Sequence, residues 1–113
     1  SMIGIYVIRN KITDECYIGQ SINIPKRWDA HRANMNNKKY ALYVDMRYYG
    51  LQNFSFSVLE KCDRSELDEK EDYWIAKYQD LGFHLYNIKG VAAKEAAYEK
   101  QHRRYQKSFK KYR

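Results

Sequence analysis

The pattern of apolar and polar positions predicts a hairpin at the start of the chain. Residues 3–8 are apolar or aromatic apart from one glycine, which is typical of a strand buried on both faces. Residues 10–15 are polar and turn-like, and residues 16–19 form a second short run of apolar and small residues. Two such runs around a polar loop of about six residues predict a β-hairpin.

Two helices are predicted after the hairpin. Asn23, placed as the N-cap ahead of Pro25, begins a helix that runs to about residue 36. A second helix is predicted over residues 41–49. Gly50 ends it, because glycine readily adopts the left-handed conformation that closes a helix.

A strand and a third helix complete the predicted fold. Apolar residues alternate with serines over residues 54–58, which predicts a strand with one polar face. Ser65 and Asp68 have the spacing of a capping box, and the helix that they open reaches about residue 78. Residues 85–88 add a short extended segment. The order β-β-α-α-β-α predicts a small mixed α/β (α+β) fold and not a parallel, doubly wound sheet.

Charge divides the chain into a near-neutral body and a basic tail. The 113 residues are enough for one domain with an extension, so we expect a domain over residues 1–90 and a tail over residues 91–113. Residues 94–113 contain eight basic and two acidic side chains, which is +6 of the net charge of +7. A basic tail favours a polyanionic partner, most often nucleic acid, although acidic proteins and anionic membranes attract such tails too.

The tail also has a helical period. Tyr98, Tyr105 and Tyr112 recur every seven residues with Phe109 between the last two, which predicts an aromatic stripe on a basic helix. We expect this helix to contact nucleic-acid phosphates without much sequence specificity. The expected contacts are Lys100, Arg103, Arg104, Lys107, Lys110, Lys111 and Arg113. Two alternatives stay open: the stripe packs on the body or on a second copy, or the tail begins a longer specificity region.

Cysteine and hydropathy patterns exclude several classes of protein. Cys16 and Cys62 belong to no C-x-x-C pair and to no Cys/His cluster with metal-ligand spacing, so neither a disulfide scaffold nor a zinc finger is expected. The longest apolar stretch is far shorter than the ~20 residues that cross a bilayer, and no basic leader precedes it. We therefore expect a soluble intracellular protein, cytoplasmic or nucleoid-associated, without a membrane partner.

Two ionisable residues lie on helix faces that are otherwise apolar. At about 100° per residue, Glu71 falls within the apolar stripe of the third helix, where its carboxylate needs a cation or a metal as partner. His31 falls within the stripe of the first helix, one turn after Arg27. The alternative interpretations are structural: Glu71 forms an ion pair with an arginine at the rim, and His31 is a satisfied core residue.

The hairpin brings two tyrosines together. A loop that is symmetric about its two central residues pairs Tyr6 with Gly19 and places Tyr17 beside it on the same face of the sheet. Gly19 and Gly4 would leave space over that face for a ligand or for close approach of backbone. The structural alternative is that both tyrosines only pack.

We expect the carboxylate, the arginine, the histidine and the two tyrosines to converge on one face of a three-stranded sheet. This set suits hydrolysis of a phosphodiester. The carboxylate would hold a divalent metal, the guanidinium would bind the scissile phosphate and its transition state, and a hydroxyl or imidazole would take a proton from water.

In these residues the sequence resembles the GIY-YIG endonuclease family. Gly4-Ile5-Tyr6 and Tyr17-Ile18-Gly19 are the two tripeptides that name the family. They are followed in order by Lys26-Arg27-Trp28 and His31, by Glu71-Asp72-Tyr73-Trp74-Ile75, and by Tyr86-Asn87-Ile88. The resemblance covers about residues 2–90. It implies a metal-dependent DNA endonuclease with a small, three-stranded, mostly antiparallel sheet flanked by helices.

The resemblance also implies roles for the central residues. Glu71 resembles the single metal ligand of the family, for Mg²⁺ or Mn²⁺. Arg27 resembles the residue that binds the phosphate and stabilises the transition state. Tyr6 resembles the general base or the hydroxyl that orients water, with His31 as its proton acceptor. Which of Tyr6 and His31 is the base stays open, because a phenol has an unperturbed pKa of about 10.

Further residues of the family pattern are expected around this centre. Tyr17 resembles the second tyrosine, which positions the phosphate or the waters of the metal. Asn87 resembles the residue that braces the site, and Lys26 is expected to contact DNA beside Arg27. Gly4 and Gly19 are the glycines of the two tripeptides.

The resemblance leaves the biological role open. The small layout with a tail favours a homing-type endonuclease of a mobile element or phage. A structure-specific repair or recombination nuclease comes second and a restriction enzyme third, while the complete set of site residues argues against a non-catalytic DNA-binding module. Because one site nicks one strand per event, cutting of both strands needs a second copy, as in a homodimer, or sequential attack. An additional specificity region or partner is the other expected association.

Overall fold

The structure, a computed structural model, describes residues 2–88 and confirms a small α+β fold. The three strands of its antiparallel sheet, in the order β2-β1-β3, are β1 (Gly4–Asn10), β2 (Cys16–Ser21) and β3 (Phe54–Lys61). The helices are α1 (Ile24–Ala33), α2 (Ala41–Tyr49) and α3 (Leu67–Asp80), with the 3₁₀ turns η1 (Leu51–Asn53) and η2 (Arg64–Glu66). The predicted tail, with its aromatic stripe and phosphate contacts, lies outside residues 2–88. None of the helices within that range has the length and apolar composition needed to span a bilayer.

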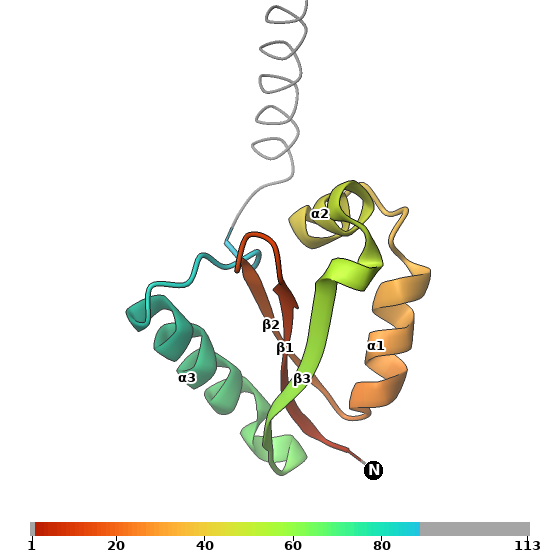
Figure 1. Ribbon diagram of the computed structural model, residues 1–113. Coiled ribbons are helices and arrows are strands. Elements are labelled where there is room, and N and C mark those ends of the chain that lie inside the picture. Colours follow the sequence, from red (N-terminus) through yellow and green to blue (C-terminus); the bar gives the residue numbers. More distant parts are fainter. Residues whose placement is uncertain (1, 89–113) are drawn as a thin grey trace, which may run out of the picture.

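Different helices cover the two faces of the sheet (Figure 1). Side chains of β1 alternate between two cores, as the period of a strand requires. Tyr6 and Ile8 pack in one core with residues of α1 and α2, and Ile5 and Val7 pack in the other with residues of α3. The face that carries the tyrosines is therefore separated from α3 by the sheet itself.

The hairpin has the predicted register, with Tyr6 opposite Gly19. A β-carbon added to Gly19 would collide with the ring and hydroxyl of Tyr6, because that ring covers the glycine. A β-carbon added to Gly4 would collide with the backbone of Glu60, at the irregular pairing between β1 and β3. Both glycines thus allow close approach of protein atoms, and the alternative expectation of space for a ligand is wrong.

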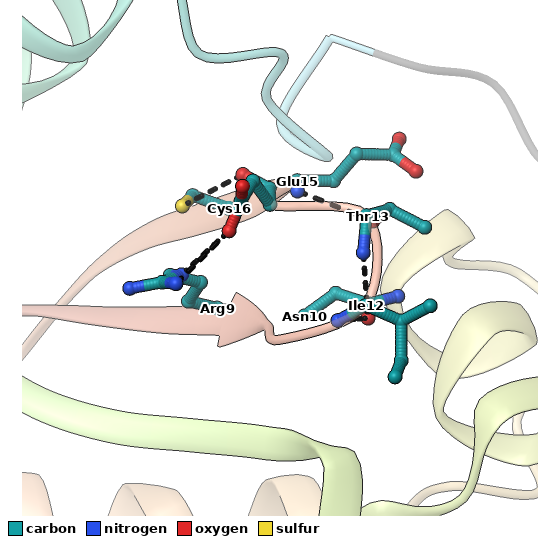
Figure 2. A network of polar contacts seen from close by, with 7 residues as sticks. Arg9, Asn10, Ile12, Thr13, Glu15 and Cys16 are labelled. Carbon is teal, nitrogen blue, oxygen red and sulfur yellow. Dashed lines mark hydrogen bonds and ion pairs between the residues drawn. The ribbon is translucent and has the colours of Figure 1, made fainter.

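Side chains hold the turn of the hairpin in place (Figure 2). The Asn10 side-chain oxygen accepts hydrogen bonds from the backbone N–H groups of Ile12 and Thr13, at 2.9 and 3.3 Å. Arg9 and Asp14 form an ion pair of 3.0 Å across the turn, where Asp14 adopts the left-handed conformation with φ of 64°. Such local bonds fix the register of β1 and β2, and with it the positions of the two tyrosines.

The boundaries of α1 and α2 follow the predicted signals closely. The Asn23 side chain caps α1 by accepting a hydrogen bond from the Lys26 N–H at 3.2 Å. Gly50 follows α2 with a positive φ of 89°, which ends the helix. The end of α1 differs, because the helix stops at Ala33 and not near residue 36.

The predicted capping box of the third helix is wrong by two residues. Asp63 and Glu66 form the box, and the Glu66 carboxylate accepts a hydrogen bond from the Asp63 N–H at 3.2 Å. Ser65 and Asp68 lie within the turn and the helix that follow. The difference arises because the chain already coils in η2, before the first apolar residue of α3.

Candidate active site

A cleft of about 560 Å³ gathers four of the six predicted catalytic residues, namely Tyr17, Arg27, His31 and Asn87. It extends from α1 to the segment before α2 and to the turn after α3. The wall contains further polar or aromatic residues for which the sequence predicted no role, namely Asn34, Asn37, Lys39, Tyr40, Tyr43 and Tyr86. Tyr6, Glu71 and Lys26 are not part of the wall; Lys26 lies exposed on the first turn of α1.

A buried chain of hydrogen bonds lies beside the cleft. The Tyr6 hydroxyl contacts His31 Nε2 at 2.7 Å, and His31 Nδ1 contacts the Tyr43 hydroxyl at 2.8 Å. Strand β1 supplies the first residue, α1 the second and α2 the third, and Tyr6 and His31 are only 1% and 2% exposed. His31 is therefore a satisfied core residue, as one interpretation expected, and it is also hydrogen-bonded to Tyr6.

Tyr17 and Arg27 complete this cluster. The Tyr17 ring lies 5.5 Å from the His31 ring and 6.3 Å from the Tyr6 ring, measured between centroids. Arg27 lies one helical turn before His31, on the exposed surface of α1. No ion pair joins Arg27 to a carboxylate within residues 2–88. Its guanidinium is therefore available to an anionic ligand.

The environment sets the protonation of the cluster at neutral pH. Burial, together with the positive charge of Arg27, lowers the pKa of His31 to about 4, so its imidazole is neutral. Burial also raises the pKa of Tyr6 and of Tyr17, an effect that the Arg27 charge opposes at both residues. Both phenols are therefore protonated near pH 7. The neutral imidazole leaves one ring nitrogen free to accept a proton.

The low pKa of His31 predicts a loss of stability in acid. The unfolded chain binds a proton at a histidine with pKa 6.5, whereas the folded His31 does so only near pH 4, so stability falls as the pH drops through this range. Between pH 7 and pH 5 the expected loss is about 2 kcal/mol. Urea unfolding of the wild type and of His31→Gln at both pH values measures it. An equal loss in the variant would contradict the assignment.

Glu71 lies apart from the face that carries the tyrosines, which corrects the expected convergence on one face. It belongs to α3, behind the sheet, because the apolar residues of that helix pack in the second core. The Gln20 side-chain amide of the edge strand β2 donates hydrogen bonds to Glu71 at 3.0 Å and to Asp68 at 2.8 Å. Burial is the main cause of the raised pKa of Tyr17. The Arg27 charge opposes this effect, and the Glu71 charge raises the pKa further. The carboxylate thus acts on the site around the edge of β2.

The surroundings of Glu71 fit a hard divalent cation with few protein ligands. Its neighbour is the neutral amide of Gln20, and within residues 2–88 no ion pair joins Glu71 to a lysine or arginine, so the expected arginine partner is missing. The same part of the chain contains no cluster of three or more metal-ligating side chains. Mg²⁺ is commonly bound by one or two carboxylates and keeps most of its waters. A single carboxylate with a free charge meets that requirement.

Asn87 pairs with the outer edge of β2. Its side-chain amide donates to the Ile18 carbonyl at 2.8 Å and accepts from the Ile18 N–H at 3.0 Å. Ile18 lies between Tyr17 and Gly19, so the Asn87 amide fixes the strand segment that carries Tyr17. This is the geometry that a bracing residue requires.

A second buried network holds α2 against the body. The Tyr86 hydroxyl donates a hydrogen bond of 2.6 Å to the Asp45 carboxylate of α2. The Asn10 amide donates to the same hydroxyl at 3.1 Å. The hairpin turn, α2 and the segment after α3 are thereby joined at one point. Because Tyr43 and Asp45 share α2, this network also fixes the position of Tyr43.

Tyr43 is the clearest site residue that sequence reasoning missed. It lies among the buried residues of α2, where an aromatic side chain is most simply interpreted as core. The available signal was its hydroxyl, since a buried tyrosine oxygen usually finds a polar partner. The sequence did not indicate that this partner is His31.

Known proteins share the fold and the family motifs of this chain. Residues 2–87 match the family of the GIY-YIG catalytic domain. The fold is similar to the catalytic domain of the homing endonuclease I-TevI, with 22% identity and a TM-score of 0.62 over 74% of this chain and 96% of that chain. A mutant of the catalytic domain of the intron endonuclease I-TevI gives 22% identity and a TM-score of 0.64 over 74% and 92% of the two chains. Because the family match spans most of the sequence, this chain belongs to the GIY-YIG catalytic domain family.

Proposed function

We propose that this chain is a divalent-metal-dependent endonuclease that hydrolyses phosphodiester bonds in DNA. The observation that carries the proposal is the buried Tyr6–His31 hydrogen bond of 2.7 Å beside an Arg27 guanidinium that no carboxylate within residues 2–88 pairs with. A proton acceptor and an anion-binding group next to a cleft are what phosphodiester hydrolysis requires.

Arg27 binds the scissile phosphate in this mechanism. A guanidinium donates several hydrogen bonds in a plane and matches the oxygens of a phosphate. In the free protein its positive charge lowers the pKa of the Tyr6 hydroxyl, against the larger effect of burial. The phosphate also neutralises a charge that holds the pKa of His31 down.

Tyr6 and His31 then remove the proton of the attacking water. The water oxygen forms a bond to phosphorus, its proton passes to the Tyr6 oxygen, and the phenol proton passes to His31 Nε2. The bond between phosphorus and the leaving oxygen breaks, and that oxygen takes up a proton from solvent. This relay avoids a free phenolate, which burial of Tyr6 disfavours.

Glu71 and Tyr17 act at the edge of the site. Bound by Glu71, Mg²⁺ or Mn²⁺ would stabilise the negative charge that develops on the phosphate and the leaving oxygen. Tyr17 lines the cleft and is protonated near pH 7, so its hydroxyl donates a hydrogen bond to a phosphate oxygen. The wall of the cleft also contains Lys39, a second cation for a neighbouring phosphate.

We assign the chain to a homing-type role, with a repair, recombination or restriction role as the alternatives. The likeness in fold to the catalytic domain of a homing endonuclease supports this choice. Double-strand cutting then needs a second copy or two successive nicks. The ratio of linear to nicked plasmid distinguishes these modes.

Metal-dependent nicking of supercoiled plasmid tests the proposed activity. We expect nicked and then linear DNA in the presence of Mg²⁺ or Mn²⁺, no cleavage in EDTA, and recovery when excess Mg²⁺ is added back. Cleavage that persists in EDTA would contradict the metal dependence. Binding of DNA without cleavage under any of these conditions would favour a non-catalytic module.

A further inference from the structure

Tyr43 approaches the proposed proton acceptor from the side opposite Tyr6. Its hydroxyl lies 2.8 Å from His31 Nδ1, while the Tyr6 hydroxyl lies 2.7 Å from Nε2. The two rings of the Tyr43–His31 pair meet edge to face, with centroids 5.7 Å apart. Tyr43 is 5% exposed and belongs to α2, which carries none of the family motif residues.

The protonation of His31 limits how these two contacts can be arranged. A neutral imidazole has one N–H donor and one bare nitrogen that accepts. One tyrosine must therefore donate to the ring, and the other must accept from it. Nε2 can receive the proton of Tyr6 only if Tyr6 is the tyrosine that donates and Tyr43 is the one that accepts.

The neighbours of each hydroxyl settle the direction. Within residues 2–88, the side-chain partner of the Tyr6 hydroxyl is His31 Nε2 at 2.7 Å, so this nitrogen is the acceptor for the Tyr6 O–H. Tyr6 is 1% exposed. If Nε2–H donated to the Tyr6 oxygen instead, the buried Tyr6 O–H would lack an acceptor. Tyr43 lines the cleft, where its own O–H can reach water or DNA. Nδ1 therefore carries the proton and donates it to Tyr43.

We propose that Tyr43 is a positioning residue, whose oxygen accepts the Nδ1–H of His31 and keeps the Nε2 lone pair aimed at Tyr6. The inference rests on the proposed function. When Nε2 receives the Tyr6 proton, the same hydrogen bond stabilises the imidazolium. This is the role of an orienting group behind a histidine base, filled here by a neutral phenol.

Within residues 2–88, aromatic rings from three elements lie against the His31 ring. Tyr6 faces the ring from β1, Tyr17 from β2, and Tyr43 from α2. Arg27, on the same helix as His31, contributes the charge that acts on it. Tyr43 is the group among these that contacts Nδ1, and the Asp45–Tyr86 hydrogen bond of 2.6 Å holds its helix in place.

Nitrogen NMR of the His31 ring in the DNA-free protein near pH 7 tests the inference directly. The wild type is expected to show Nδ1 protonated and Nε2 bare, with the His31 signals assigned by their loss in His31→Gln. In Tyr43→Phe the ring of residue 43 stays but the acceptor is gone, so the tautomer is expected to shift toward Nε2–H. A wild-type ring that already carries its proton on Nε2, or a tautomer that Tyr43→Phe leaves unchanged, would overturn the proposal.

Cleavage kinetics supply the second readout. Tyr43→Phe is expected to lower the single-turnover rate by about 10–100-fold, with DNA affinity changed by less than about twofold. Tyr48→Phe removes a hydroxyl from the same helix at an exposed position outside the cleft wall and is expected to leave rate and tautomer unchanged. The NMR result needs no activity. If Tyr43→Phe shifts the tautomer but the wild type cuts no DNA, the hydrogen bond of Tyr43 is supported and the proposed nuclease function is contradicted. If the wild type cuts DNA and Tyr43→Phe cuts at the full rate, only the role of Tyr43 is contradicted.

Discussion

Replacement of Glu71 with glutamine is expected to abolish DNA cleavage, with a loss of at least about 10³-fold, while DNA binding persists. The substitution removes the negative charge that would hold the metal. It keeps the shape of the side chain and an oxygen that can accept the 3.0 Å hydrogen bond from Gln20, so the packing of α3 is retained. Single-turnover cleavage of plasmid in Mg²⁺ measures the rate, and a gel shift without metal measures DNA affinity.

Asp68 offers a matched control for Glu71. It lies one helical turn earlier on α3 and accepts a 2.8 Å hydrogen bond from the same Gln20 amide, but its side chain is more exposed. Asp68→Asn is expected to change the rate by less than a few-fold. Wild-type cutting by Glu71→Gln would remove the metal-ligand assignment. Loss of cutting in both variants would assign the metal to Glu71 and Asp68 together.

Replacement of Arg27 with alanine is expected to slow cleavage of bound DNA by about 10²–10³-fold. The guanidinium is placed to stabilise charge that develops on the phosphate, and within residues 2–88 no carboxylate ion pair diverts it. Stability is expected to change little, because Arg27 lies on the exposed surface of α1. Single-turnover rates at saturating protein separate this effect from a weaker affinity.

Two variants of α1 sharpen the interpretation of Arg27. Arg27→Lys keeps the charge but loses the planar donor geometry, and an intermediate rate is expected. Arg32→Ala removes a second arginine of the helix, one that is engaged by Asp29 at 3.1 Å and lies 4.5 Å from the centre of the Phe56 ring. Its rate is expected to stay within a few-fold of the wild type. A comparably small effect of Arg27→Ala would reduce Arg27 to a DNA contact.

The elements of the fold were predictable because their signals are local. Apolar runs marked the first two strands and alternation marked the third, Asn23 and Gly50 marked helix ends, and the symmetry of the loop gave the pairing of Tyr6 with Gly19. The misplaced capping box shows the limit of such signals. The sequence also contains the spacing of the box that forms, since Glu66 lies three residues after Asp63, and only the path of the chain through η2 shows which of the two boxes closes.

The candidate site was predictable where its residues follow one another on a single element or hairpin. Arg27 and His31 share one face of α1 by helical geometry, and Tyr6 and Tyr17 meet by strand pairing. The predicted position of Glu71 was wrong, because an apolar stripe shows that a helix packs but not on which side of the sheet. The roles of these residues, Asn87 included, stay predictions.

Local sequence patterns were enough to predict the order of elements, the register of the hairpin, and the placement of a histidine one helical turn after an arginine. These depend on residues that are close along the chain, where backbone geometry alone sets the distances. Tertiary packing places α3 over the opposite face, so that Glu71 acts on the site around β2, and it brings Tyr43 of α2 to His31 Nδ1. Contacts between distant segments follow from how whole faces bury their apolar area, and many arrangements of the same local elements would satisfy the sequence pattern.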